Sequence, residues 1–319
     1  MEPTKLERLS FIKYLFELAV DQSEQPEPAC CVSILMFHDA VELFLQLAAE
    51  DFGVSQKKPS FMGYWEALEP KLCEGHPTQK ESMRRMNKAR VDLKHHGIRP
   101  SRLDIESMRG ATQSFFVENT ESIFDIPFTR LSLIELVGNE GARRLLWQAE
   151  ELYGDGDSEL AAGSVRAAFH LVMQEGYDRR SWFHPSSLQR AEMELQTFTD
   201  HAFRFSRGLS DVEEAVWEIQ KLREHVFPHV INAIKELSAE LSKLSDAVDV
   251  LAHGIDHRQY TRFLRITLNA SVDEEGKIRL HEQRAEYRLT SDELSGCIRF
   301  VVECALKLQE RSNLLKYRD

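Results

Sequence analysis

Apolar residues recur at helical spacing along most of the N-terminal half of the chain. The period predicts helices over residues 5–19, 29–51, 61–72, 78–96 and 104–122. The second helix is apolar almost all round, and its few polar positions include His38 and Glu42, four residues apart on one narrow stripe. Gly53 and Gly97 stand where the second and fourth helices are expected to end. The pattern therefore predicts a bundle of five helices over residues 1–125.

The C-terminal half is also mainly helical, but its period changes near the end. Residues 126–138 are predicted to link the bundle to a second domain, residues 139–319. Helices are expected over residues 140–153, 158–174, 211–251 and 291–310, and Thr290 and Glu293 have capping-box spacing before the last of them. Alternation over residues 263–271 and 277–283, around a turn, predicts a β-hairpin near 263–283. The predicted fold is mostly α with one hairpin.

Composition places this chain among intracellular proteins. It has 319 residues and a net charge of −12. Its five cysteines are an odd number at irregular spacing, which is typical of reduced thiols in the cytoplasm rather than of a set of disulfides. The best apolar run, residues 29–37, is much shorter than the roughly 20 residues that span a bilayer, and the N-terminus lacks the order of a signal peptide. We expect a cytoplasmic protein that does not enter a membrane.

One segment departs from the acidic character of the chain. Residues 78–110 contain nine Lys or Arg against four Asp or Glu, a local charge of +5. Within this segment the run Asn87-Lys-Ala-Arg-Val-Asp-Leu-Lys-His-His-Gly97 falls at the predicted end of the fourth helix, where positive side chains are favoured. The end of this helix and the loop after it are therefore predicted to face an anion.

The same run resembles the motif of the HEPN family (higher eukaryote and prokaryote nucleotide-binding domains). Members of this family are bundles of four or five helices with Arg-x4-6-His near the end of a long helix. Arg90 and His95 have the four-residue spacing, and His96 would fit the five-residue spacing. The resemblance covers about residues 5–125. It implies catalytic Arg90 and His95, auxiliary phosphate contacts from Lys94 and His96, and His38 and Glu42 as polar groups of the cleft.

By this resemblance the chain would be a metal-independent endoribonuclease of a bacterial toxin or antiphage defence system. A neutral imidazole can take the proton of a ribose 2′-hydroxyl, and a guanidinium can stabilise the charge that develops on the phosphate. Arg90 and His95 are five positions apart, about 140° around a helix, so one helix does not aim both at the same atom. In the family two such helices pair across a dimer.

The alternative is a HEPN-like binding or dimerisation subunit, without catalysis, in a larger defence or regulatory complex. Val91 stands where active members usually carry a polar residue, and Gly97 where many carry a tyrosine. Arg90 and His95 would then only bind a partner or stabilise the end of the helix.

The second half is open to two interpretations. Residues 247–255 can be aligned with residues 90–98. In this alignment Ala247 and Ala252 replace Arg90 and His95, as expected of a degenerate second HEPN copy that has lost both functional side chains. The other interpretation is an unrelated helical domain that binds a partner or gates the first.

No metal and no cofactor is predicted, since the pair Cys73 and His76 lacks the second half of a zinc site. The partners expected are an RNA substrate such as tRNA, a second copy of the chain or a tandem pseudo-dimer, and a regulatory protein.

Overall fold

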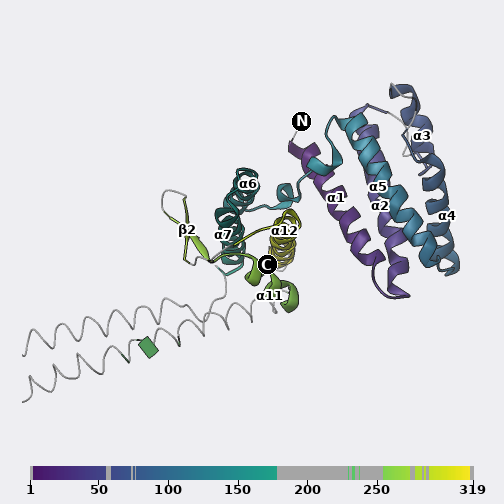
Figure 1. Ribbon diagram of the computed structural model, residues 1–319. Coiled ribbons are helices and arrows are strands. Elements are labelled where there is room, and N and C mark those ends of the chain that lie inside the picture. The colour runs from purple at the N-terminus through teal and green to yellow at the C-terminus, as the bar shows by residue number, and fades with distance from the viewer. Residues whose placement is uncertain are drawn as a thin grey trace, which may run out of the picture. The chain divides into compact units, whose positions relative to one another are not determined.

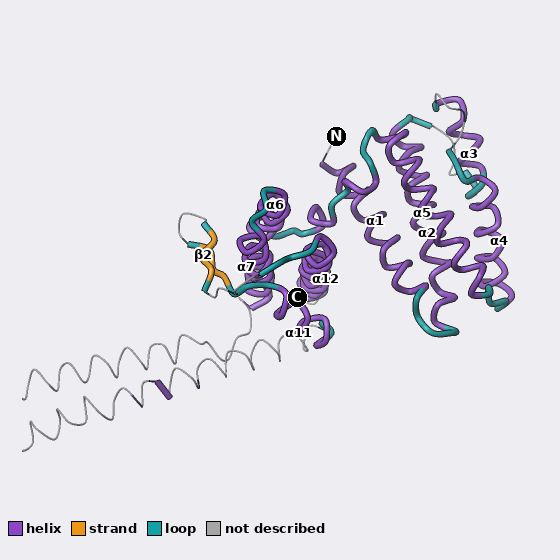
Figure 2. Tube along the Cα trace, viewed as in Figure 1, coloured by secondary structure: helices purple, strands orange, loops and turns teal. Residues whose placement is uncertain are grey.

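The structure is a computed structural model, which describes residues 3–54, 59–72, 75, 77–177, 254–273, 277–281, 284 and 287–316, together with residues 229, 232, 233 and 237. The described chain is mostly helical with a single two-stranded hairpin, as the sequence predicted (Figures 1 and 2). It divides into two compact units, residues 1–147 and 148–319. The division falls within helix α6, Glu140–Gly154. The predicted helix over residues 211–251 lies outside the described residues, apart from four isolated positions.

The N-terminal unit contains the five helices expected from the sequence. They are α1 (Pro3–Ser23), α2 (Ser33–Asp51), α3 (Gly63–Leu68), α4 (Lys80–His96) and α5 (Arg102–Phe124). A 3-10 turn over Ala29–Val32 precedes α2, and another over Glu69–Lys71 follows α3. Helix α1 packs along α2, and α2 also contacts α4 and α5. The apolar α2 thus forms the centre of this unit.

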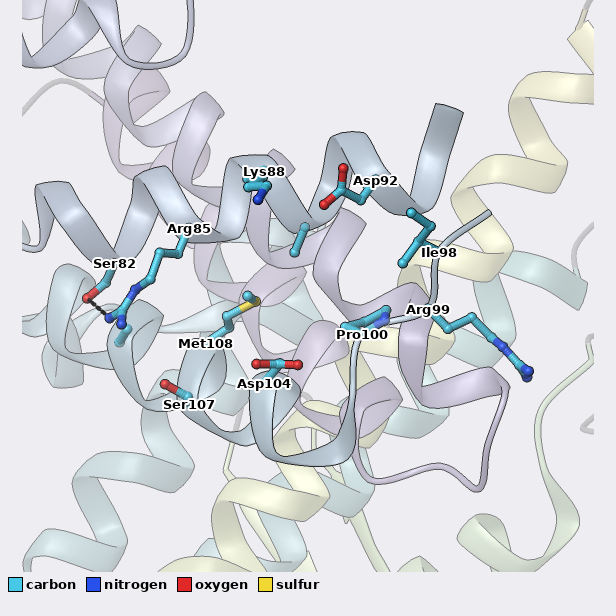
Figure 3. Close-up of a pocket in the computed structure, with 12 residues that line it drawn as sticks. Ser82, Arg85, Lys88, Asp92, Ile98, Arg99, Pro100, Asp104, Ser107 and Met108 are labelled. Atoms are coloured by element: carbon cyan, nitrogen blue, oxygen red, sulfur yellow. Dashed lines mark hydrogen bonds between the residues drawn. The ribbon is translucent and has the colours of Figure 1, made fainter. Parts of the chain in front are cut away.

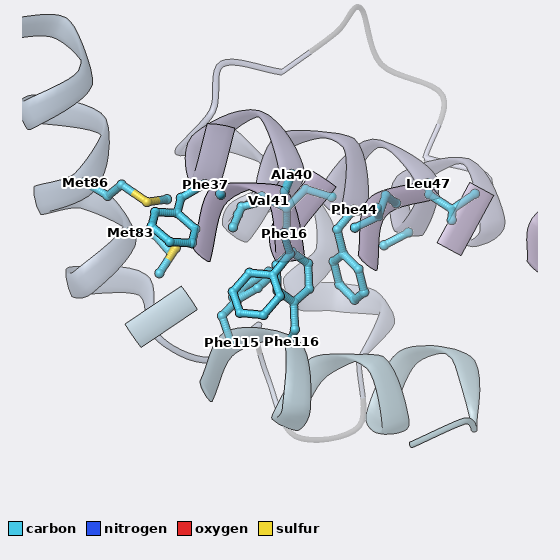
Figure 4. Packing of buried hydrophobic residues seen from close by; sticks show 14 of the residues in the cluster. Phe16, Phe37, Ala40, Val41, Phe44, Leu47, Met83, Met86, Phe115 and Phe116 are labelled. Atoms are coloured by element: carbon cyan, nitrogen blue, oxygen red, sulfur yellow. The ribbon is translucent and has the colours of Figure 1, made fainter. Parts of the chain in front are cut away.

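Interlocking aromatic rings fill the core between these helices (Figure 4). Phe116 of α5 is fully buried and contacts the rings of three other elements. Its ring centroid lies 5.3 Å from that of Phe16, 5.6 Å from that of Phe44 and 5.1 Å from that of Phe128. Such edge-to-face and stacked pairs add to the stabilisation that comes from removing apolar surface from water.

Residues 126–138, predicted as a linker, pack against the N-terminal unit. They form two 3-10 turns, Phe128–Arg130 and Leu133–Leu136, and the second turn contacts α1. Ile134 and Val137 are fully buried. This segment is therefore packed against α1 within the N-terminal unit.

The second unit includes α7 (Ser158–Tyr177), α11 (His257–Ile266), β1 (Ala270–Val272), β2 (Ile278–Leu280) and α12 (Ser291–Lys316). Its strands are antiparallel, with Ser271 opposite Arg279. The hairpin was predicted, but its first strand is shorter than expected, because residues 263–266 belong to α11. Tyr260 and Phe263 are one helical turn apart, and both rings lie within 6 Å of the ring of Phe169 in α7. This packing favours the helix over the strand.

One segment, Ala29–Asp51, could span a membrane by length and composition, with a mean hydropathy of 1.5. The expectation that the protein does not enter a membrane is not contradicted by this helix, since the core helix of a soluble protein meets the same criteria of length and composition. In the structure 61% of this window is buried inside the protein. Burial of this kind is normal for the core helix of a soluble protein, and a cytoplasmic location stays a prediction.

Gly163 of α7 provides a test of how the hairpin packs. A β-carbon added there would lie 2.5 Å from Leu280 Cδ2 and 3.2 Å from Ala270 Cβ. We expect Gly163→Val to lower the free energy of unfolding by about 1–3 kcal/mol through overpacking. Gly296→Val is the matched control, because that α12 glycine faces open space and valine is the better helix former. Equal melting temperatures for the two variants would contradict this packing.

Candidate functional site

Helix α4 carries the predicted motif and is held firmly against the bundle. Met83 and Met86 are fully buried and lie beside Phe37 of α2 (Figure 4), and Thr112 of α5 donates a hydrogen bond to the sulfur of Met86 at 3.7 Å. The helix ends at His96, and Gly97 adopts the left-handed conformation with φ of +67°. Glycine reaches this conformation without strain, so the helix stops directly after the motif.

Polar contacts also hold the chain just before α4. The buried amide of Asn119 in α5 accepts from the backbone N–H of Thr78 at 2.9 Å and donates to the Thr78 hydroxyl at 2.8 Å. The indole N–H of Trp65 donates to the carbonyl of Pro77 at 2.7 Å. These contacts fix the first half of α4, and Ala89 and Leu93 pack against the core further along. The helix therefore has a defined rotation about its axis, and this rotation decides where each motif side chain points.

The motif side chains divide between two environments. Arg90 is half-buried, whereas Lys94, His95 and His96 are exposed in the last turn. Helix α4 is continuous from Lys80 to His96, so Arg90 and His95 lie about 140° apart around its axis. A single chain therefore presents His95 to solvent and turns Arg90 toward the bundle, and the two side chains do not converge on one helix.

Arg90 instead lies near His38 of α2. The His38 ring is 1% exposed and stacks on Phe61, with centroids 4.1 Å apart and planes at 27°. Its Nε2 lies 3.1 Å from Asn87 Oδ1. Because an amide oxygen only accepts, Nε2 must carry the proton of this hydrogen bond. Asn87 lies one helical turn before Arg90 on α4. It was not predicted as a site residue, although its three-residue spacing from Arg90 is visible in the sequence.

The other ring nitrogen of His38 faces two carboxylates. Nδ1 lies 3.6 Å from Asp39 Oδ1 and 3.8 Å from Glu42 Oε2, and it makes no hydrogen bond within the described structure. Burial, and then the positive charge of Arg90, lower the pKa of His38 below its ordinary value, outweighing the opposite effect of Glu42. The predicted cleft residues His38 and Glu42 are thus brought together, and Asp39, which was not predicted, lies beside them.

A groove of about 320 Å³ runs between α4 and α5 on another side of α4 (Figure 3). Its basic side chains are Arg85, Lys88 and Arg99, against two carboxylates, Asp92 and Asp104. In Figure 3 Arg85 lies along the groove beside Ser82, whereas Arg99 extends away from it. The basic and acidic side chains of this groove nearly balance, so the anion-facing character expected for residues 78–110 stays a prediction.

The start of α5 forms one wall of this groove and carries a full capping box. Ser101 Oγ accepts from the backbone N–H of Asp104 at 3.2 Å, and the Asp104 carboxylate accepts from the backbone N–H of Ser101 at 3.1 Å. The hydrogen bond from the Ser101 side chain, then that from its backbone, holds the pKa of Asp104 below its ordinary value.

We expect Ser101→Ala to lower stability by about 0.5–2 kcal/mol, the usual loss for a removed N-cap. NMR titration should also show the pKa of Asp104 rising toward its ordinary value. A carboxylate with a depressed pKa stabilises the fold above its unfolded pKa, and this stabilisation is lost as pH falls through the folded pKa. The difference in stability between wild type and variant should therefore shrink in acid. A pKa of Asp104 unchanged by the substitution would contradict the capping box.

Comparisons with known proteins give no match that would assign a function to this site. The chain matches no protein-family model, no curated protein and no solved structure. The overlay proposed for a second copy falls mostly on residues 247–253, and the pair Cys73 and His76 also lies outside the described residues. All the site residues predicted from the sequence are described, and they lie on α2 and α4.

Proposed function

We propose that the chain is a HEPN-type endoribonuclease of a bacterial toxin or antiphage system, which cleaves RNA without a metal. The observation that supports this best is the last turn of α4, where Lys94, His95 and His96 are exposed directly before the helix ends. These side chains are on a helix that packs against the bundle through Met83, Met86 and Leu93, so they can be presented to a substrate in a defined geometry.

The chemistry needs one proton acceptor and one fixed positive charge. The neutral imidazole of His95 takes the proton of a ribose 2′-hydroxyl, whose oxygen attacks the adjacent phosphorus. The bond to the 5′-oxygen breaks, that oxygen receives a proton, and the products carry a 2′,3′-cyclic phosphate and a 5′-hydroxyl. The guanidinium of Arg90 stabilises the charge on the phosphate oxygens during this step.

The placement of the two side chains on α4 favours a composite site. Since Arg90 and His95 point about 140° apart, we propose that the His95 of one chain works with the Arg90 of a second copy. Lys94 and His96, beside His95, are suited to hold neighbouring phosphates. The groove of Arg85 and Lys88 on the same helix offers a path for the RNA backbone.

A second candidate is a binding module without catalysis. Ile98 and Leu103, on either side of the turn between α4 and α5, are 59% and 81% exposed. Apolar side chains exposed in this way suit contact with a partner protein, and Arg90 would then serve mainly as a positive charge beside His38.

The test is cleavage of total RNA and purified tRNA by the full chain, with EDTA present throughout. We expect cleavage that leaves cyclic-phosphate ends, and toxicity on expression that disappears with Arg90→Ala. Intact RNA at high protein concentration would overturn the enzyme and favour the binding module, and the next experiment would then be a search for a partner protein.

A further inference from the structure

The cluster of His38, Asp39 and Glu42 on α2 has the composition and geometry of a site for a transition-metal ion. Its three ligand atoms all lie within 4.8 Å of one another. In a tetrahedral zinc site with bonds of about 2.0–2.1 Å, neighbouring ligand atoms are about 3.4 Å apart. The observed distances of 3.6 and 3.8 Å from His38 Nδ1 to the two carboxylates are close to that value.

The buried state of Nδ1 is an independent observation that points to a ligand. The His38 side chain is 98% buried, and its Nδ1 has no hydrogen-bond donor or acceptor among the described residues. Asn87 Oδ1 accepts the hydrogen bond donated by the Nε2–H group, so in a neutral ring Nδ1 presents a lone pair toward two carboxylates. A buried polar atom in this position is costly unless a positive group satisfies it.

The surroundings of the ring are those of a metal-binding histidine. Such a histidine usually donates its other N–H to an oxygen, which fixes the tautomer and the orientation of the ring. Asn87 supplies that oxygen, and the stacked ring of Phe61 holds the plane of the imidazole. Asp39 is 58% exposed and Glu42 is 35% exposed, so an ion can enter from solvent and water can complete its coordination.

We propose that His38, Asp39 and Glu42 bind one divalent transition-metal ion, with Zn²⁺ as the best probe. One imidazole nitrogen and two carboxylate oxygens suit this class of cation better than Mg²⁺ or Ca²⁺. The metal is not required by the proposed ribonuclease chemistry, which uses Arg90 and His95 and is assayed in EDTA, although His38 and Glu42 also belong to the predicted cleft. Arg90 opposes the ion electrostatically, so the site and the motif helix are coupled through charge.

The test is calorimetric titration of the full chain with Zn²⁺, followed by Co²⁺ absorption to identify the ligands. We expect Glu42→Gln and Asp39→Asn each to weaken one Zn²⁺ site by at least about tenfold, and Asn87→Ala by about 10–100-fold. Both acidic side chains are partly exposed, so these variants should fold even where His38→Ala does not. Arg90→Ala should tighten Zn²⁺ binding, because it removes the opposing charge.

Matched controls separate this site from others on the chain. Glu66→Gln and His257→Ala change exposed residues outside the cluster and should leave the titration unchanged. Bound Co²⁺ should show visible bands without a thiolate charge-transfer band, since the site contains no cysteine. Zn²⁺ affinity unaltered by Glu42→Gln and Asp39→Asn, or a thiolate band, would overturn the proposal whether or not the chain cleaves RNA.

Discussion

RNA cleavage by the full chain in EDTA is expected to fall by about 10²–10⁴-fold in His95→Ala, the usual contribution of a general base. Arg90→Ala should lose about 10²–10³-fold, as when a group that stabilises transition-state charge is removed. Arg84→Ala is the matched control, because Arg84 is exposed on the same helix and pairs only with Glu81 among the described residues, at 3.4 Å. Unchanged cleavage by His95→Ala would contradict the assignment.

Mixing the two inactive variants tests whether the site is shared between chains. In a symmetric dimer each of two composite sites takes Arg90 from one chain and His95 from the other. A heterodimer of Arg90→Ala with His95→Ala then contains one site with both side chains intact. Since half of the randomly assorted dimers are heterodimers, activity should return to about a quarter of the wild-type value. No recovery from an exchanging mixture would contradict the composite site.

Replacing Phe116 by alanine is expected to cause the largest loss of stability in the N-terminal unit. The ring is fully buried and contacts Phe16, Phe44, Phe115 and Phe128. Removing it takes away apolar contact and leaves a cavity between α1, α2 and α5, for a loss of about 3–5 kcal/mol. Hydrogen exchange of α2 and α5 in the full chain should show this loss as a lower opening free energy.

The neighbouring residue is the control for this substitution. Val117 is 45% exposed on the same helix, and Val117→Ala should change stability by no more than about 0.5 kcal/mol. Similar effects of the two substitutions would mean that the aromatic cluster does not hold the bundle together.

The cluster of His38, Asp39 and Glu42, with Asn87 beside it, could be predicted only in part from the sequence. The four-residue spacing of His38 and Glu42 was visible on the predicted helix, and both were assigned to the cleft. Asp39 was missed because adjacent helical residues usually point about 100° apart. Asn87 was missed because it lies 49 positions from His38, and only the packing of α2 against α4 brings their side chains into contact.

By itself the sequence determined the local features of this protein. Helical periodicity located the helices of the N-terminal unit, Gly97 marked the end of α4, and the spacing of Thr290 and Glu293 identified the capping box observed at α12. These features depend on residues within a few positions of one another, so a linear pattern contains them.

Only the tertiary structure decided how these elements meet. Residues 263–266 alternate like a strand, yet they are helical because Phe263 packs against Phe169 and Phe300. The rotation of α4 likewise turns Arg90 toward His38 and leaves His95 in solvent. Both outcomes follow from the burial of apolar surface between elements far apart in the chain, which periodicity along one element does not encode.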